Sequence, residues 1–143
     1  MSHKSGTASY KSEVQIGPVI KRLKVRSDFL RIAADRRNWA APGLVLQVSE
    51  TPKETYNRDS LRIGYTASRK VGNAVKRNRA RRRLRNVVQK VMSANASCGK
   101  DFVIIARKST VQRPFLDLIN DLETALKKLD SWKVNHKNNI NNH

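Results

Sequence analysis

Histidine, cysteine and acidic residues are scarce in this sequence, and their scarcity excludes several kinds of site. The single cysteine, Cys98, cannot form an internal disulfide, and the three histidines stand at positions 3, 136 and 143, close to the two ends. Structural zinc sites require about four closely spaced Cys or His ligands, so we expect no metal bound by the protein alone. The few acids are scattered and no Ser or Cys stands beside a recognisable base, so we expect no catalytic residues.

Long apolar runs are missing as well. No run of about eighteen apolar residues occurs, and the N-terminal residues lack the apolar core of a signal peptide. A basic amphipathic helix can lie on a membrane surface, but the one in this sequence has Val and Ala on its apolar side and no Trp or Phe anchor. We therefore expect a soluble, cytoplasmic protein with no membrane partner.

Positive charge is abundant where negative charge is missing. The chain has 30 Lys and Arg against 11 Asp and Glu, a formal net charge of +19. Between Asp59 and Asp101 there is no acid but there are twelve bases, and residues 69–85 alone hold nine of them. A solvated helix face normally carries both signs, whereas cations alone repel one another until an anion neutralises them. The run predicts a polyanionic partner, although charge alone would fit RNA, DNA or an anionic membrane.

The pattern within the basic run predicts a helix with one buried side. Its apolar stripe is Val71, Ala74 or Val75, Ala80, Leu84, Val87, Val88 and Val91. The remaining surface is basic, with Arg77, Arg81 and Arg85 four residues apart and Arg79, Arg82 and Arg83 beside them. A planar guanidinium binds a phosphate through two parallel hydrogen bonds, so this pattern favours nucleic acid. Asn78 either contacts a sugar hydroxyl or a base edge, or caps a neighbouring backbone group.

Periodicity along the chain predicts an α+β fold of the α/β sandwich type, with a small mixed sheet of about four strands and three helices. Strands are expected at 44–48, 61–68 and 102–106, and helices at 28–34, from 72 to about 92, and at 115–129. Ser27 is expected to cap the first helix. The strand, helix and strand between 61 and 106 form a parallel βαβ crossover.

We expect one domain at residues 20–132, preceded by a flexible N-terminal extension at 1–19 and followed by a disordered, Asn-rich tail at 133–143. The segment 50–60 is expected to connect two antiparallel strands.

Alternation predicts which side chains face the core. Leu44, Leu46 and Val48 should point inward, which leaves Val45 and Gln47 on the opposite side of the sheet. Trp39 is either a core anchor or a substitute ring for stacking on bases, and we favour the core anchor. In the last helix, we expect Asp117, Asp121 and Glu123 to point outward.

Three segments carry a resemblance to a known family. Residues 64–79, which read GYTASRKVGNAVKRNR, with Arg81, Arg82 and Arg85, closely resemble the signature of the bacterial ribonuclease P protein subunit. Asp101 to Arg107 resembles the strand that follows this helix in the family. Arg22-Leu23-Lys24 with Asp28-Phe29 is similar to its N-terminal segment. Together these matches cover about residues 20–130.

The resemblance implies a ribosomal-protein-like fold with a left-handed crossover, and a function in tRNA processing. In this family the chemistry belongs to a catalytic RNA, which uses bound Mg²⁺ to remove the 5′ leader of precursor tRNA, so the chain would be the non-catalytic protein subunit of an endoribonuclease. The implied contacts with the catalytic RNA are Arg77, Asn78, Arg79, Arg81, Arg82 and Arg85.

The resemblance also implies a cleft for the single-stranded leader, formed by Phe29, Val45, Gln47, Thr66 and Arg69. Aromatic rings in such a cleft can stack on bases without reading their identity. This sequence has Ala33 and Gln47 where the family often has aromatics, so leader affinity is expected to depend more on charge.

Two other functions fit parts of the sequence. A ribosomal or RNA-assembly protein would share the charge and the fold but would promote no cleavage. A sequence-specific DNA-binding protein fits less well, because no leucine heptads follow the basic run and no helix-turn-helix pair precedes it. The type of the partner RNA, the oligomeric state of the complex, the leader-sequence preference, the order of the termini on binding and the ranking of the arginines stay open.

Overall fold

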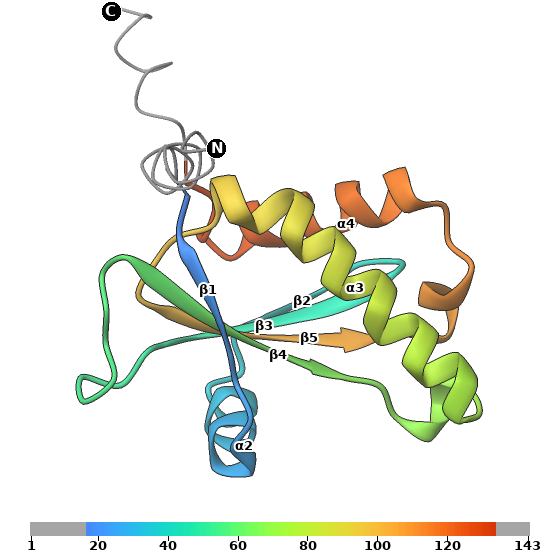
Figure 1. Ribbon diagram of the computed structural model, residues 1–143, viewed down its shortest axis with the longest axis horizontal. Coiled ribbons are helices and arrows are strands. Elements are labelled where there is room, and N and C mark those ends of the chain that lie inside the picture. Colours follow the sequence, from blue (N-terminus) through green and yellow to red (C-terminus); the bar gives the residue numbers. More distant parts are fainter. Residues whose placement is uncertain (1–16, 134–143) are drawn as a thin grey trace, which may run out of the picture.

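The computed structural model describes residues 17–133, which form a five-stranded mixed sheet covered by helices on both faces (Figure 1). The elements are β1 (Val19–Arg22), α2 (Arg26–Ala34), β2 (Asn38–Ala40), β3 (Leu44–Glu50), β4 (Ser60–Thr66), the 3-10 turn η1 (Arg69–Val71), α3 (Ala74–Asn95), β5 (Lys100–Ala106), η2 (Lys108–Val111) and α4 (Phe115–Lys128). Residues 1–16 of the predicted extension at 1–19, and the tail from residue 134, lie outside the described residues. No helix in the described part is both long and apolar enough to cross a membrane.

The predicted α+β architecture is confirmed, with one more strand than expected. The strand order is β1-β4-β5-β3-β2, in which β4 and β5 are parallel and β3 is antiparallel to β5. The near-continuous apolar strand β5 is central, as predicted, because both of its faces are covered. The short strands β1 and β2 escaped prediction because four and three residues are too few to show a period.

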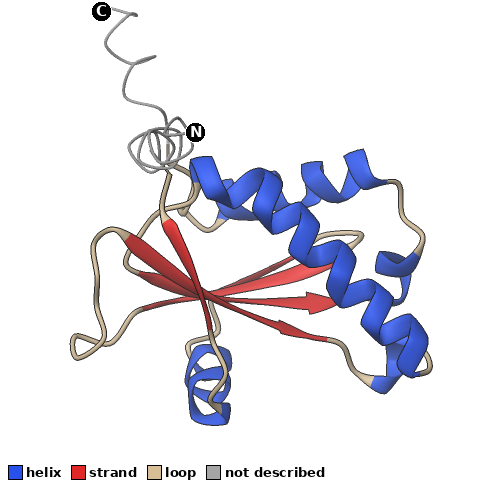
Figure 2. Cartoon of the chain, viewed as in Figure 1, coloured by secondary structure: helices blue, strands red, loops and turns tan. Residues whose placement is uncertain are grey.

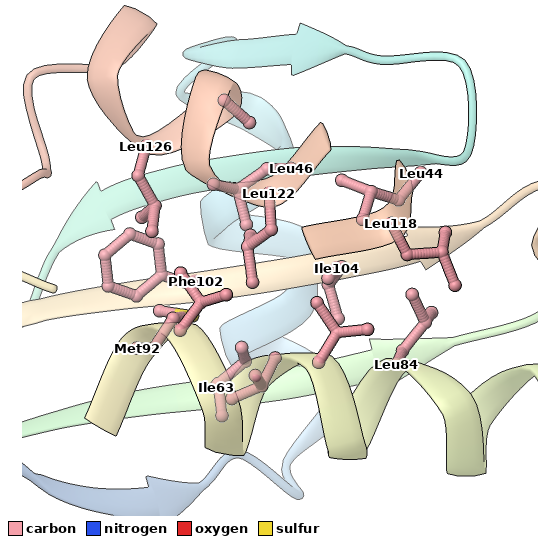
Figure 3. Close-up of a cluster of buried hydrophobic side chains, with 14 of the residues drawn as sticks. Leu44, Leu46, Ile63, Leu84, Met92, Phe102, Ile104, Leu118, Leu122 and Leu126 are labelled. Carbon is pink, nitrogen blue, oxygen red and sulfur yellow. The ribbon is translucent and has the colours of Figure 1, made fainter. Parts of the chain in front are cut away.

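The main core lies between the sheet and the helix pair α3 and α4 (Figures 2 and 3). Leu44, Leu46 and Val48 of β3 are fully buried there, as alternation predicts. The side chains that α3 buries against the sheet are Ala80, Leu84, Val87, Val88, Val91 and Met92. A smaller cluster on the opposite face of the sheet packs Phe29 and Ile32 of α2 against Leu23, Val103 and Ile105. The sheet therefore has one face filled by core packing and one face that only α2 covers.

The start of α3 differs from the predicted stripe. Val71 is buried, but it belongs to η1, and Gly72 follows with a φ of 144°. This backbone break resets the helical phase, so Val75 is 76% exposed and Ala74 is exposed as well. Asn73 is the N-cap, and its side chain accepts a hydrogen bond of 3.0 Å from the Lys76 amide.

One further expectation was confirmed and three were wrong. The segment 50–60 connects two antiparallel strands, β3 and β4, although β5 lies between them. Ser27 lies inside α2, whose N-cap is Val25. Trp39 lies on the edge strand β2 and is 36% exposed, with the Lys128 ammonium 5.4 Å from its ring centre. Asp121 is buried, because the Arg113 guanidinium and the Gly43 amide donate hydrogen bonds to its carboxylate.

Candidate RNA interface

The positive charge on the basic side of α3 has no acidic partner among the described residues. The helix carries eight bases and no acid, and none of the ion pairs among residues 17–133 includes an α3 side chain. The buried stripe keeps these bases on the outer surface of the helix. We call the six residues predicted to contact RNA the α3 basic face: Arg77, Asn78, Arg79, Arg81, Arg82 and Arg85. A polyanion is the partner that would relieve the repulsion among them.

The members of the α3 basic face are not equivalent. Arg82 is exposed, whereas Arg77 is half-buried and its Nε atom is buried without a hydrogen-bond partner. Arg79 donates from Nε to the Val111 carbonyl at 3.2 Å, which ties α3 to η2. Arg81 donates to Asn78 Oδ1 at 2.9 Å. Asn78 therefore orients a neighbouring guanidinium and caps no backbone group, and its amide N–H donors stay available.

Arg83 belongs to the same basic run but has a structural role. Its guanidinium donates to the carbonyls of Thr110 and Arg113, both at 2.5 Å, and so fixes the segment that leads into α4. Burial and the nearby charge of Arg79 lower the pKa of Arg83. Arg83 was not among the residues predicted to bind RNA, and in the structure its hydrogen bonds go to other residues of the protein.

The residues of the predicted cleft lie on the face of the sheet that carries α2. Val45, Ile105 and Thr66 form one row across β3, β5 and β4, and Gln47, Val103 and Gly64 form the next. At about 4.8 Å between strands, Val45 and Thr66 are about 10 Å apart. Four of the five predicted residues, namely Phe29, Val45, Gln47 and Thr66, therefore share one surface. Arg69 lies beyond the end of β4, exposed on η1.

A hollow of about 350 Å³ opens on this surface, lined by Lys24, Arg26, Phe29, Tyr65 and Thr66, and we call it the α2 pocket. It brings Phe29 and Thr66 together, whereas Val45 and Gln47 lie outside it on β3. Sequence reasoning missed Lys24, Arg26 and Tyr65 as pocket residues. Lys24 lies between β1 and α2, and Arg26 is the first residue of α2, so the two bases place positive charge beside an aromatic ring.

Gly64 permits the close approach of α2 to the sheet. A Cβ atom at this position would overlap the Phe29 ring and lie 3.3 Å from Leu23 Cβ. Gly64→Ala is therefore expected to lower the free energy of unfolding by about 1–3 kcal/mol through overpacking. Urea unfolding of Gly64→Ala, Phe29→Leu and the double variant tests the cause. The smaller Leu side chain frees the space that the added methyl group needs. The double variant should therefore lose less unfolding free energy than the two single variants together, and additive losses would contradict this contact.

The next row of this face holds a buried ionic network. Asp101 on β5 is fully buried and accepts two hydrogen bonds from Arg62, at 2.9 and 2.6 Å, one from Arg31 at 2.5 Å and one from Thr51 at 2.7 Å. Arg31 belongs to α2, so the network fastens this helix to the sheet. Burial raises the pKa of Asp101, but the hydrogen bonds from Arg62, Thr51 and Arg31 outweigh it and hold the pKa below the ordinary value.

The described residues provide no metal site of their own. No three His, Cys, Asp or Glu side chains between residues 17 and 133 come together to hold an ion. The clustered carboxylates, Asp28 and Asp101, face guanidinium groups instead. Cys98 is half-buried in the turn after α3, and burial raises the pKa of its thiol, which disfavours the reactive thiolate.

Fold and charge together define a small basic α+β protein that presents an arginine-rich helix from a parallel strand-helix-strand unit. The family model described as Ribonuclease P matches residues 18–130. A ribonuclease P protein component of Paramagnetospirillum magneticum is 53% identical over 117 residues, which cover 82% of this chain and 88% of the relative. That of Ruegeria pomeroyi is 43% identical, with 80% and 90% covered. The chain belongs to the ribonuclease P protein component family.

Solved structures agree with this assignment. The Staphylococcus aureus RNase P protein superposes with a TM-score of 0.64 at 29% identity, covering 78% of this chain and 97% of that one. The protein from Thermotoga maritima has the same fold, with a TM-score of 0.59 at 24% identity over 76% of this chain and 96% of that one. Family membership implies a partnership with ribonuclease P RNA and a part in tRNA processing.

Proposed function

We propose that the chain is the RNA-binding subunit of ribonuclease P and assists a catalytic RNA in removing the 5′ leader of precursor tRNA. The observation that carries the proposal is the α3 basic face, whose arginines have no carboxylate partner among the described residues of a ribonuclease P family member. The reaction is hydrolysis of a phosphodiester by an endonuclease, and the protein contributes binding. Its place of action is the cytoplasm.

The two surfaces have different tasks in this proposal. The α3 basic face, Arg77, Asn78, Arg79, Arg81, Arg82 and Arg85, docks on the catalytic RNA and offsets repulsion between phosphates. The opposite side of the sheet, with Phe29, Val45, Gln47 and Thr66, holds the single-stranded leader, and Arg69 on η1 beyond the end of β4 contributes a further contact. Leader contacts exist for the precursor and not for the product, so they favour precursor binding.

Mg²⁺ is the cofactor of the proposed reaction and is held mainly by the RNA. When bound, it supplies the charge stabilisation that phosphodiester hydrolysis requires. The chain acts on this requirement indirectly, because guanidinium groups that neutralise nearby phosphates let the folded RNA reach its active form at a lower Mg²⁺ concentration.

The test is cleavage of a 5′-extended precursor tRNA by a bacterial ribonuclease P RNA at limiting Mg²⁺. The reaction is run alone, with this protein, and with an unrelated protein of equal net charge. Strong stimulation by this chain alone is the expected result. Equal stimulation by both proteins, or none by either, would reduce the chain to a basic RNA-binding domain and favour a ribosomal or RNA-assembly role.

A further inference from the structure

Tyr65 lies where the two proposed RNA surfaces meet. Its side chain packs against the main core, on the side of the sheet that α3 covers, and Tyr65 also lines the α2 pocket together with Phe29 and Thr66. The guanidinium of Arg85, a member of the α3 basic face, lies 6.0 Å from the Tyr65 ring centre. The guanidinium of Arg22 on β1 approaches the same ring to 5.6 Å. Pairing between β1 and β4 ends at Ile63, so Tyr65 stands on a stretch of β4 that β1 no longer covers.

The two guanidinium groups at Tyr65 are free to bind an anion. Neither Arg22 nor Arg85 forms an ion pair or donates a side-chain hydrogen bond within residues 17–133. A cation-π contact holds a guanidinium in place without using its N–H donors in hydrogen bonds. Two cations at one ring repel each other, and a phosphate between them would remove that repulsion.

The tyrosine itself stays neutral at physiological pH. Burial raises the pKa of Tyr65 to about 12, although the charges of Arg22 and Arg85 act in the opposite direction. Its phenol group therefore remains an O–H that can donate a hydrogen bond to a phosphate or a ribose oxygen.

We propose that Tyr65, Arg22 and Arg85 form a phosphate-binding site that passes one RNA strand from the α3 basic face into the α2 pocket. The ligand is a backbone phosphate of single-stranded RNA, with the adjoining nucleotide in the pocket beside Phe29. Lys24 and Arg26 face the same hollow and continue the positive charge along the strand. The inference rests on the proposed function and deepens it, because it joins the two RNA surfaces into one continuous path.

The experiment measures binding of the holoenzyme, assembled from the full chain and ribonuclease P RNA, to precursor tRNA and to leaderless tRNA at several KCl concentrations. Tyr65→Leu and Arg22→Gln are each expected to weaken precursor binding about tenfold, the loss of one charge-assisted contact, without weakening leaderless binding. Arg22→Gln should also flatten the log-log salt dependence by about 0.7. Tyr65→Phe keeps the aromatic ring that both guanidinium groups contact, so it should lose less affinity for precursor tRNA than Tyr65→Leu.

Tyr56→Leu is the matched control, because Tyr56 is an exposed tyrosine in the loop between β3 and β4. It should bind both RNAs as the unsubstituted protein does. Equal losses for precursor and leaderless tRNA in Arg22→Gln, or no loss, would overturn the inference. If the unsubstituted holoenzyme discriminates between the two RNAs and the variants match it, the inference alone fails. If the unsubstituted holoenzyme binds precursor and leaderless tRNA equally, and the protein does not stimulate cleavage by the RNA, the proposed function fails and the inference fails with it.

Discussion

Replacing Asp101 by asparagine is expected to lower the free energy of unfolding by about 3 kcal/mol. Asp101 is fully buried and accepts hydrogen bonds from Arg62, Arg31 and Thr51. Asparagine has nearly the same shape but no charge, so two guanidinium groups would lose the anion that compensates them. The expected loss lies at the lower end for broken buried ion pairs, because Arg31 and Arg62 keep 33% and 18% side-chain exposure to water.

Urea unfolding measures this loss, with Glu54→Gln as the control. Glu54 is an exposed acid in the loop between β3 and β4, so removing its charge should change stability by less than about 0.5 kcal/mol. A domain of this size has a total stability of about 5–15 kcal/mol, so the Asp101 variant should be visibly destabilised and still fold. Equal effects of the two substitutions would show that the network contributes no more than surface charge.

The same variant should alter the response to acid. The pKa of Asp101 is lower in the folded protein than in the unfolded chain, where an aspartate titrates near about 3.9. Its contribution to stability is therefore fully present above that pH and is lost as the pH falls through the folded pKa. Unfolding free energies measured from pH 6 to about pH 2 should show a shallower acid limb in Asp101→Asn than in the unsubstituted protein. An unchanged slope would contradict the lowered pKa.

Arg77→Ala is expected to weaken binding to ribonuclease P RNA by about 10- to 100-fold, while Lys90→Ala weakens it less than about threefold. Both substitutions remove one positive charge from α3. Lys90 lies thirteen residues, about 20 Å, further along the helix and outside the α3 basic face. Arg77 is half-buried, so its side chain loses less conformational freedom than an exposed one when its guanidinium binds a phosphate.

Binding at several salt concentrations separates contact from general attraction. A lost phosphate contact should flatten the log-log salt slope by about 0.7–0.9 for Arg77→Ala. Both variants should keep the helicity of the unsubstituted protein, because neither side chain contributes to the core. Equal losses of affinity would mean that α3 attracts RNA through diffuse charge, and the arginines would then have no individual roles.

The sequence predicted those features that repeat along an element. The stripe from Ala80 to Val91 fixed the buried side of α3, and the apolar run 102–106 placed β5 in the middle of the sheet. Alternation in β3 placed Val45 and Gln47 on the face that α2 partly covers. Each of these follows from a period that several residues share, so one exception does not disturb it.

Features that depend on a single long-range contact could not be predicted. Asp121 looks like an outward acid by helical spacing, and it is buried because Arg113 and Gly43 satisfy its carboxylate. Trp39 looks like a core anchor by composition, and it is an edge residue because β2 pairs only with β3. The same reason hid Tyr65, whose neighbours Arg22 and Arg85 lie 43 and 20 positions away in the chain.

The position of β5 has a consequence for how the chain folds. Both β3 and β4 take their main pairing from β5, which is the last strand in the sequence. Among the strands that precede it, β2 and β3 can pair as a local hairpin and β1 can pair with β4, but only β5 joins these two pairs into one sheet. Loop closure over long separations must therefore occur before the sheet is complete. A nascent chain that ends before Lys100 exposes its arginine helix and lacks the central strand of the sheet on which this helix packs. Folding of the domain waits for residues 100–106 to leave the ribosome.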